Sequence, residues 1–172
     1  MDLRVGMWKQ EKLEAQIETV EQIKDSCVIS GGLAWHFMSP PHKENKYMHD
    51  HKDVDLFIFP NKFQDAISIL KQYGFNRYWT KYDGTTPGFY RYGKTHMQEE
   101  KRVKVLLDLF IEDVPYIEIK GFKIVEPKYL LDLYYKTHSS KGCVAVVEAR
   151  KLVARGIDPI GKKELIEGEH EY

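Results

Sequence analysis

Three aspartates interrupt the most apolar stretches of this chain, and they constrain its fold more than any other feature. Asp53 and Asp55 stand at the start of DVDLFIF at 53–59, and Asp108 divides VKVLLDLF at 103–110. Both stretches have the length and composition of buried strands. In a strand, residues i and i+2 point to the same face, so Asp53 and Asp55 project together, about 6.7 Å apart along the backbone. We therefore expect a β-sheet that carries carboxylates among apolar side chains.

The remaining pattern predicts an α/β (α+β) fold with a mixed β-sheet flanked by helices and followed by C-terminal helices. Helices are expected at 8–25, 33–38, 63–70, 128–137 and 142–155, strands at 27–29, 53–59, 75–82, 88–93 and 103–110, and a hairpin at 116–125 that turns at Lys120 and Gly121. The length of 172 residues favours one domain, 1–172. Its core is expected at about 26–125, with a helical part at about 127–168.

Composition excludes several classes of protein. With 42% hydrophobic and 13% aromatic residues the chain is too apolar for disorder. The 26 basic and 26 acidic residues argue against a dedicated nucleic-acid coat, although a local basic patch stays possible. No apolar run approaches the roughly 18 residues of a membrane span, and the N-terminus has no signal-peptide core. We expect a cytoplasmic protein without membrane contact, whose Cys27 and Cys143 are free buried thiols.

Burying neighbouring carboxylates costs free energy, and a hard divalent cation removes that cost. Mg²⁺ takes oxygen ligands at about 2.0–2.1 Å and keeps positions open for phosphate oxygens. Three carboxylates on adjacent strands can hold two such ions about 3.5–4 Å apart for in-line phosphoryl displacement. A structural interpretation stays open for each part. Asp53 can simply begin a strand, Asp108 can pair with Arg102 or Lys104, and Ser30-Gly31-Gly32 can be an ordinary strand-to-helix turn.

Taken together, the segments VISGGLAWHF, HKDVDLFIF and VKVLLDLF resemble the nucleotidyltransferase superfamily that includes DNA polymerase β. The pattern is most similar to small AbiEii-like members and lincosamide-type antibiotic nucleotidyltransferases. The signature is a glycine pair that opens a helix, D-x-D on the next strand and a third aspartate on a later strand. Its positions here are Gly31 and Gly32, Asp53 and Asp55, and Asp108, within about residues 26–110.

The resemblance implies a metal-dependent enzyme that transfers a nucleoside monophosphate from a nucleoside triphosphate, such as ATP, to a hydroxyl acceptor and releases pyrophosphate. Asp53, Asp55 and Asp108 would bind Mg²⁺ or Mn²⁺, and Asp108 would also accept the acceptor's proton. Backbone N–H groups around Ser30, Gly31 and Gly32, at the start of the helix, would hold the triphosphate. The acceptor stays open among a small molecule, a protein and an RNA such as tRNA.

Several further residues lie near this pattern. Lys52 and His51 adjoin the acidic site, and Lys104 shares a strand face with Asp108, so each is a candidate for phosphate or carboxylate contact. The histidine- and proline-rich segment 39–51 is longer than the family's usual spacing and is a candidate lid or substrate loop. Its histidines do not match a structural zinc pattern, so we expect them to be solvated. Lys141 is a candidate phosphate contact by family analogy alone.

Basic and aromatic residues alternate between 77 and 104, which is compatible with single-stranded RNA binding. A strand with an aromatic core face and a solvated basic face explains the same pattern and is favoured. The alternative function is a catalytically inactive nucleotidyltransferase-fold module that binds or regulates a protein partner. Retention of all three costly carboxylates speaks against it. A toxin-like enzyme acting on tRNA would share the chemistry of the first function.

Overall fold

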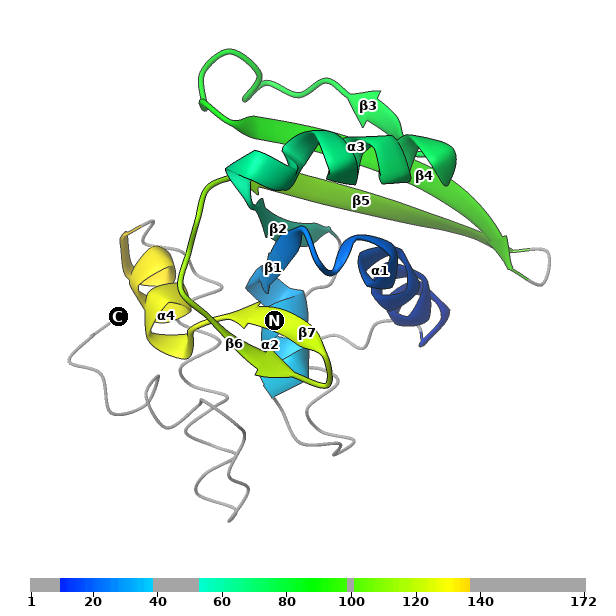
Figure 1. The fold of residues 1–172 in the computed structure, drawn as a ribbon. Coiled ribbons are helices and arrows are strands. Elements are labelled where there is room, and N and C mark those ends of the chain that lie inside the picture. Colours follow the sequence, from blue (N-terminus) through cyan, green and yellow to red (C-terminus); the bar gives the residue numbers. More distant parts are fainter. Residues whose placement is uncertain (1–9, 39–52, 99–100, 137–172) are drawn as a thin grey trace, which may run out of the picture.

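A seven-stranded mixed sheet organises the protein, as seen in a computed structural model that describes residues 10–38, 53–98 and 101–136 (Figure 1). In chain order the elements are α1 (Gln10–Ile23), β1 (Cys27–Ser30), α2 (Gly31–Met38), β2 (Val54–Ile58), the 3₁₀ turn η3 (Pro60–Lys62), α3 (Phe63–Gln72), β3 (Asn76–Tyr78), β4 (Phe89–Gln98), β5 (Lys101–Ile111), β6 (Tyr116–Ile119), β7 (Phe122–Val125) and α4 (Pro127–Lys136). The expected mixed sheet with flanking helices is confirmed.

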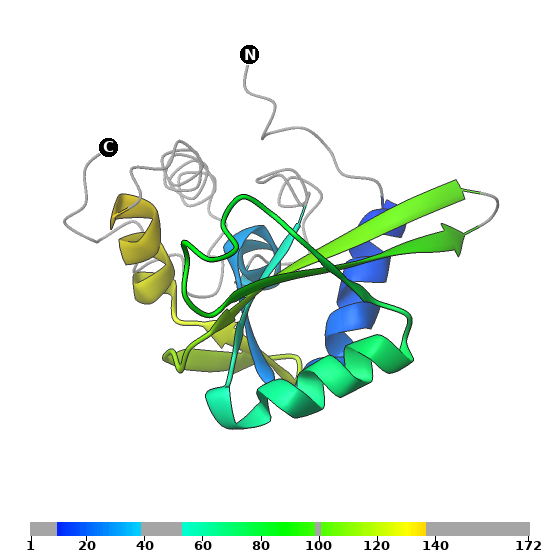
Figure 2. The ribbon, with the colours of Figure 1, turned by 90° about the horizontal axis from the view of Figure 1, so that it is seen from above.

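The strands lie in the order β3-β4-β5-β2-β1-β7-β6. The pairs β2–β5 and β1–β7 are parallel, and the other neighbours are antiparallel. Figures 1 and 2 show α1 and α3 against one face of the sheet and α2 against the other. Helix α2 packs on β1, β2 and β7 of that second face, so β2, which carries Asp55, is covered from both faces.

Alternation along the central strands explains this arrangement. Leu107 and Leu109 of β5 and Leu56 and Ile58 of β2 are fully buried, on the side that α1 and α3 cover. The helices contribute apolar faces with helical spacing, as predicted: Leu13, Val20 and Ile23 from α1, and Ala66, Ile67 and Leu70 from α3. Successive side chains of a strand alternate between the two faces, so Asp55 of β2 and Asp108 of β5 point to the opposite face of the sheet.

Several boundaries differ from the predictions. The strand expected at 75–82 is short, because Asp83 accepts hydrogen bonds from the Thr80 N–H and the Arg77 guanidinium, both at 2.5 Å, and this turns the chain. The strand expected at 88–93 continues to Gln98, since β4 stays paired with β5 along its whole length. The helix expected at 33–38 already begins at Gly31.

The hairpin at 116–125 is confirmed. Lys120 and Gly121 have φ values of 52° and 83°, the left-handed pair that a tight two-residue hairpin turn requires. The helix expected at 142–155, the segment 39–51 and residues such as Lys52 and Lys141 lie outside the described residues. No helix within the described ranges is long and apolar enough to cross a membrane.

Cys27 provides a first testable prediction. Its side chain is 1% exposed, and burial raises the pKa of its thiol to about 12. Because an unfolded thiol titrates near about 8.5, this group stabilises the fold below that pH, and the contribution is lost as the pH rises toward 12. In a Cys143→Ser variant at pH 8 we expect Cys27 to react with Ellman's reagent only after denaturation. Reaction of the native variant at the denatured rate would contradict the burial.

Candidate nucleotide site

Five side chains lie in one row across five adjacent strands and define the candidate site. Ser30 opposes Asp55, Asp55 opposes Asp108, Asp108 opposes Arg91, and Arg91 opposes Tyr78. Directly opposed residues of a sheet point to the same face. The row therefore brings Ser30, Asp55 and Asp108, which are far apart in sequence, onto one surface.

Arg91 ties the acidic residues together. Its Nε donates to Oδ1 of Asp108 at 2.6 Å, and its Nη2 donates to Oδ2 of Asp108 at 2.9 Å and to Oδ2 of Asp53 at 3.2 Å. Asp53 lies just before β2 and shares its strand parity with Asp55. The three aspartates thus converge on one side of the sheet, with the guanidinium between two of them.

The carboxylates of this cluster act on the charge of Arg91. Hydrogen bonding to Asp108 raises the pKa of Arg91, burial opposes this, and the charges of Asp108, Asp53 and Asp55 raise it further. Because Asp108 is 6% exposed, its charge lies partly out of water, where attraction for a cation is strengthened.

Gly31 opens α2 directly beside Asp55. Its φ of +61° is a conformation that glycine adopts readily, and a Cβ added there would lie 2.4 Å from Oδ2 of Asp55. Ser30 is buried and Gly32 is half-buried at the same strand-to-helix turn. The first N–H groups of a helix have no partner within the helix, so this turn offers donors next to the carboxylates.

Lys104 lies on the same face as Asp108, as its spacing predicted, but its ammonium is 4.8 Å from the centre of the Tyr78 ring. Asp108 pairs with Arg91 and not with Lys104, one of the two alternative partners considered for it. The side chain of the other, Arg102, lies outside the described part of the chain. The sequence placed Arg91 in the alternating basic and aromatic segment at 77–104 and not in this acidic cluster.

The cluster offers oxygen ligands of the kind that a metal ion such as Mg²⁺ prefers, but the described side chains do not form a complete coordination shell. Within the described ranges, no group of three or more His, Cys, Asp or Glu side chains is arranged to hold a metal ion. Both oxygens of Asp108 accept hydrogen bonds from Arg91. Mg²⁺ in phosphate-handling sites is usually held by one or two carboxylates together with substrate phosphates. The pair Asp53 and Asp55 fits that requirement in type and number.

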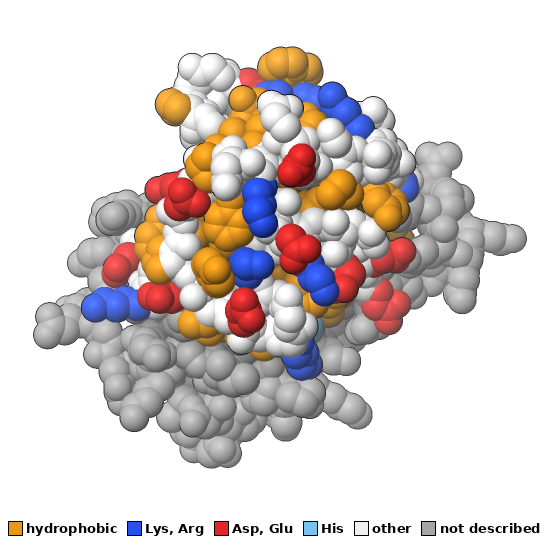
Figure 3. Space-filling model, viewed as in Figure 1, with side chains coloured by type: hydrophobic (Ala, Val, Ile, Leu, Met, Phe, Trp, Pro, Cys, Tyr) orange, Lys and Arg blue, Asp and Glu red, His pale blue; other side chains and the backbone are white. Residues whose placement is uncertain are grey.

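The basic and aromatic residues outside this cluster are largely engaged with one another. The guanidinium of Arg77 lies 4.3 Å from the Trp79 ring centre and 4.4 Å from that of Tyr90, and it is paired with Asp83. Figure 3 shows acidic and basic side chains interspersed over the α1 and α3 face. Trp79 and Tyr82 are exposed, whereas the Arg77 side chain is only 23% exposed, so the expected division into an aromatic core face and a solvated basic face does not hold for these residues.

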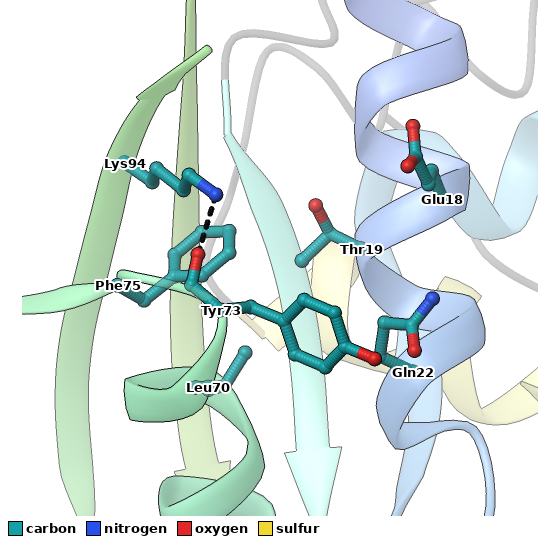
Figure 4. A pocket seen from close by; sticks show the side chains of 7 residues that line it. All are labelled: Glu18, Thr19, Gln22, Leu70, Tyr73, Phe75 and Lys94. Carbon is teal, nitrogen blue, oxygen red and sulfur yellow. Dashed lines mark hydrogen bonds between the residues drawn. The ribbon is translucent and has the colours of Figure 1, made fainter.

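A small pocket on the helical face lies apart from the carboxylates (Figure 4). It has a volume of about 100 Å³ between α1, the end of α3 and β4. Lys94, which donates to the Tyr73 carbonyl there, is three positions from Arg91 on β4 and therefore faces the opposite side of the sheet. The pocket contains none of the predicted site residues.

Comparisons with known proteins identify the fold alone. No protein-family model matches the chain, and no curated protein sequence matches it. The crystal structure of JHP933 from Helicobacter pylori is similar, with a TM-score of 0.53 and 15% identity over 76% of this chain. The chain spans 58% of the length of JHP933. The crystal structure of the Megavirus polyadenylate synthase has a TM-score of 0.43 and 14% identity, over 74% of this chain and 27% of that one. A TM-score of 0.43 does not establish a shared fold.

Proposed function

We propose that the protein is a metal-dependent nucleotidyltransferase, which transfers a nucleoside monophosphate from a nucleoside triphosphate to a hydroxyl acceptor and releases pyrophosphate. One observation carries the proposal: Asp55 and Asp108 are direct neighbours on one face, and the carboxylate of Asp55 lies against the glycine that opens α2. Carboxylates beside a helix N-terminus combine the two requirements of triphosphate chemistry, which are a place for a cation and donors for phosphate oxygens.

The strand-to-helix turn would bind the triphosphate. The N–H groups of Gly31 and Gly32 would donate to phosphate oxygens, and the positive end of the α2 dipole would add to their attraction. A missing Cβ at Gly31 keeps the backbone close to Asp55, so phosphate and carboxylate can share one cation. Ser30 lies in the same row, next to Asp55, and its hydroxyl is a third candidate donor.

Asp53 and Asp55 would hold Mg²⁺ or Mn²⁺, which neutralises the triphosphate and polarises the reacting phosphorus. Asp108 lies one strand further from α2 than Asp55. It would complete the site on the acceptor's side and accept the proton of the attacking hydroxyl. The protein's own contribution is then orientation and charge compensation, with little covalent chemistry.

Calorimetry of a nucleoside triphosphate analogue with Mg²⁺ tests the proposal. We expect the wild type to bind, and an Asp53→Ala/Asp55→Ala variant to bind at least about tenfold more weakly, because the cation loses its anionic ligands. Asp65→Ala/Asp113→Ala, which removes two exposed aspartates away from the row, is the matched control and should bind normally. Undiminished binding by the Asp53/Asp55 variant would rule out the proposed site.

Labelling identifies the acceptor. With a cell extract and Mg²⁺, nucleotidyl transfer moves the label of an α-³²P nucleotide to the acceptor, whereas a γ-³²P label leaves with pyrophosphate. A small molecule, a protein and an RNA separate on chromatography and gels. Transfer of the γ-label would indicate a kinase and contradict the proposal.

One observation favours a second function, an inactive module that binds nucleotide and acts through a protein partner. Arg91 occupies both oxygens of Asp108, the carboxylate that the reaction needs on the acceptor's side. Such a module binds the triphosphate with Mg²⁺ but labels no acceptor. The calorimetric and labelling experiments together therefore distinguish the two functions.

A further inference from the structure

Arg91 occupies the position between the carboxylates where a cation would bind. Three of its hydrogen bonds go to carboxylate oxygens, two to Asp108 and one to Asp53. Its side chain is 26% exposed, against 25% for Asp53 and 9% for Asp108, so the group is shielded from water on most sides. The guanidinium already supplies part of the charge compensation that these carboxylates need.

A metal ion and the Arg91 guanidinium compete for the same side of the Asp108 carboxylate. A divalent ion such as Mg²⁺ sits about 2.0–2.1 Å from its ligands, so it cannot enter the space between Asp108 and the guanidinium nitrogens, at 2.6 and 2.9 Å, while Arg91 stays there. Two cations that close would also repel each other in a partly buried place. Binding of a metal by Asp108 therefore requires that the guanidinium move away.

We propose that Arg91 is an internal counter-cation that competes with the divalent ion for Asp108 and Asp53, so that a metal ion takes the place between these two carboxylates only by displacing it. The role of this competition rests on the proposed function. We expect a free metal ion to bind weakly against Arg91, whereas a metal ion that arrives with a triphosphate brings extra contacts at the α2 turn. Arg91 thus favours the metal–nucleotide complex over the bare ion.

A comparison within the chain separates this role from an ordinary structural ion pair. Arg77 lies on the neighbouring strand β3, is 23% exposed and pairs with the carboxylate of Asp83. It stacks on Trp79 and Tyr90, away from the aspartate row. Arg91 differs because its guanidinium donates hydrogen bonds to two carboxylates of the aspartate row, Asp108 on β5 and Asp53 before β2. Arg77→Gln is therefore the matched control for Arg91→Gln.

The experiment measures Mn²⁺ binding without nucleotide, from the electron paramagnetic resonance signal of the free ion. We expect Arg91→Gln to bind Mn²⁺ at least about tenfold more tightly than the wild type, because the competitor is gone. Arg91→Lys keeps a positive charge but loses the bidentate hydrogen bonds to Asp108. Its affinity for Mn²⁺ should therefore lie between those of the wild type and Arg91→Gln. Arg77→Gln should match the wild type. Circular dichroism without metal establishes that each variant is folded.

Equal or weaker Mn²⁺ binding by folded Arg91→Gln would overturn the inference. Should that variant unfold without metal, Arg91→Lys decides, since unchanged affinity there has the same meaning. The proposed function fails separately, when the Asp53→Ala/Asp55→Ala variant retains Mg²⁺-nucleotide binding. If that binding is lost as expected and Arg91 variants bind Mn²⁺ like the wild type, the inference alone falls.

Discussion

Asp108→Asn is expected to lower the rate of nucleotidyl transfer at least about a thousandfold and the affinity for Mg²⁺-nucleotide by a much smaller factor. The two effects separate because Asp108 lies one strand further from the α2 turn than Asp55, so it is not needed to hold the triphosphate. Asparagine keeps the volume but loses the charge and the proton-accepting oxygen. Its amide also presents N–H donors to Arg91, at a cost in stability of about 1–2 kcal/mol.

The measurement is transfer of an α-³²P label in a single turnover, beside calorimetry on the same preparation. Asp113→Asn, which alters an exposed aspartate shortly after β5, is the control and should leave both values unchanged. A transfer rate close to that of the wild type would remove Asp108 from the reaction. An affinity that falls together with the rate would place it among the nucleotide-binding groups instead.

Gly31→Ala is expected to destabilise the fold by about 2–5 kcal/mol and to abolish nucleotide binding. The left-handed backbone costs any residue with a Cβ about 1–2 kcal/mol, and overpacking typically costs a further 1–3 kcal/mol. Here the added atom would lie 2.4 Å from Oδ2 of Asp55 and 3.2 Å from its Cβ. The β2 side chain, the α2 turn or both must therefore shift, and each belongs to the proposed site.

Gly121→Ala separates backbone strain from the collision. Gly121 has a φ of +83°, but nothing lies within 4 Å of the position its Cβ would take. We expect this variant to lose only about 1–2 kcal/mol and to bind nucleotide normally. Urea unfolding gives both free energies. Equal losses in the two variants would mean that the contact between Gly31 and Asp55 is relieved without cost.

The sequence predicted the elements of the fold because their periodicity is strong. Apolar runs marked β2 and β5, and the i, i+3, i+4 pattern marked α3. Adjacency of β2 and β5 could not be derived from spacing, because they pair in parallel with α3, β3 and β4 between them in the chain. Before the structure, only the family resemblance implied that Asp55 and Asp108 are neighbours. The register of β2 and β5 shows that they are.

Arg91 was missed for a different reason. The predicted strand stopped at Gly93, which left the register between β4 and β5 undefined. In the structure β4 ends at Gln98 and β5 begins at Lys101, and this short connection sets Arg91 opposite Asp108. Extending both strands to a common turn would have placed a basic residue in the acidic row. Gly93, which interrupts the aromatic alternation, gave the impression of a strand end.

The register of the β4–β5 hairpin also bears on how the protein folds. Arg91 and Asp108 are 17 positions apart, whereas Asp55 and Asp108 are separated by 53 positions (from 55 to 108). Contacts between nearby segments need less loop closure and form sooner than distant ones. We therefore expect the ion pair to form in the hairpin before β2 docks, so that the incoming strand meets a carboxylate whose charge is already compensated.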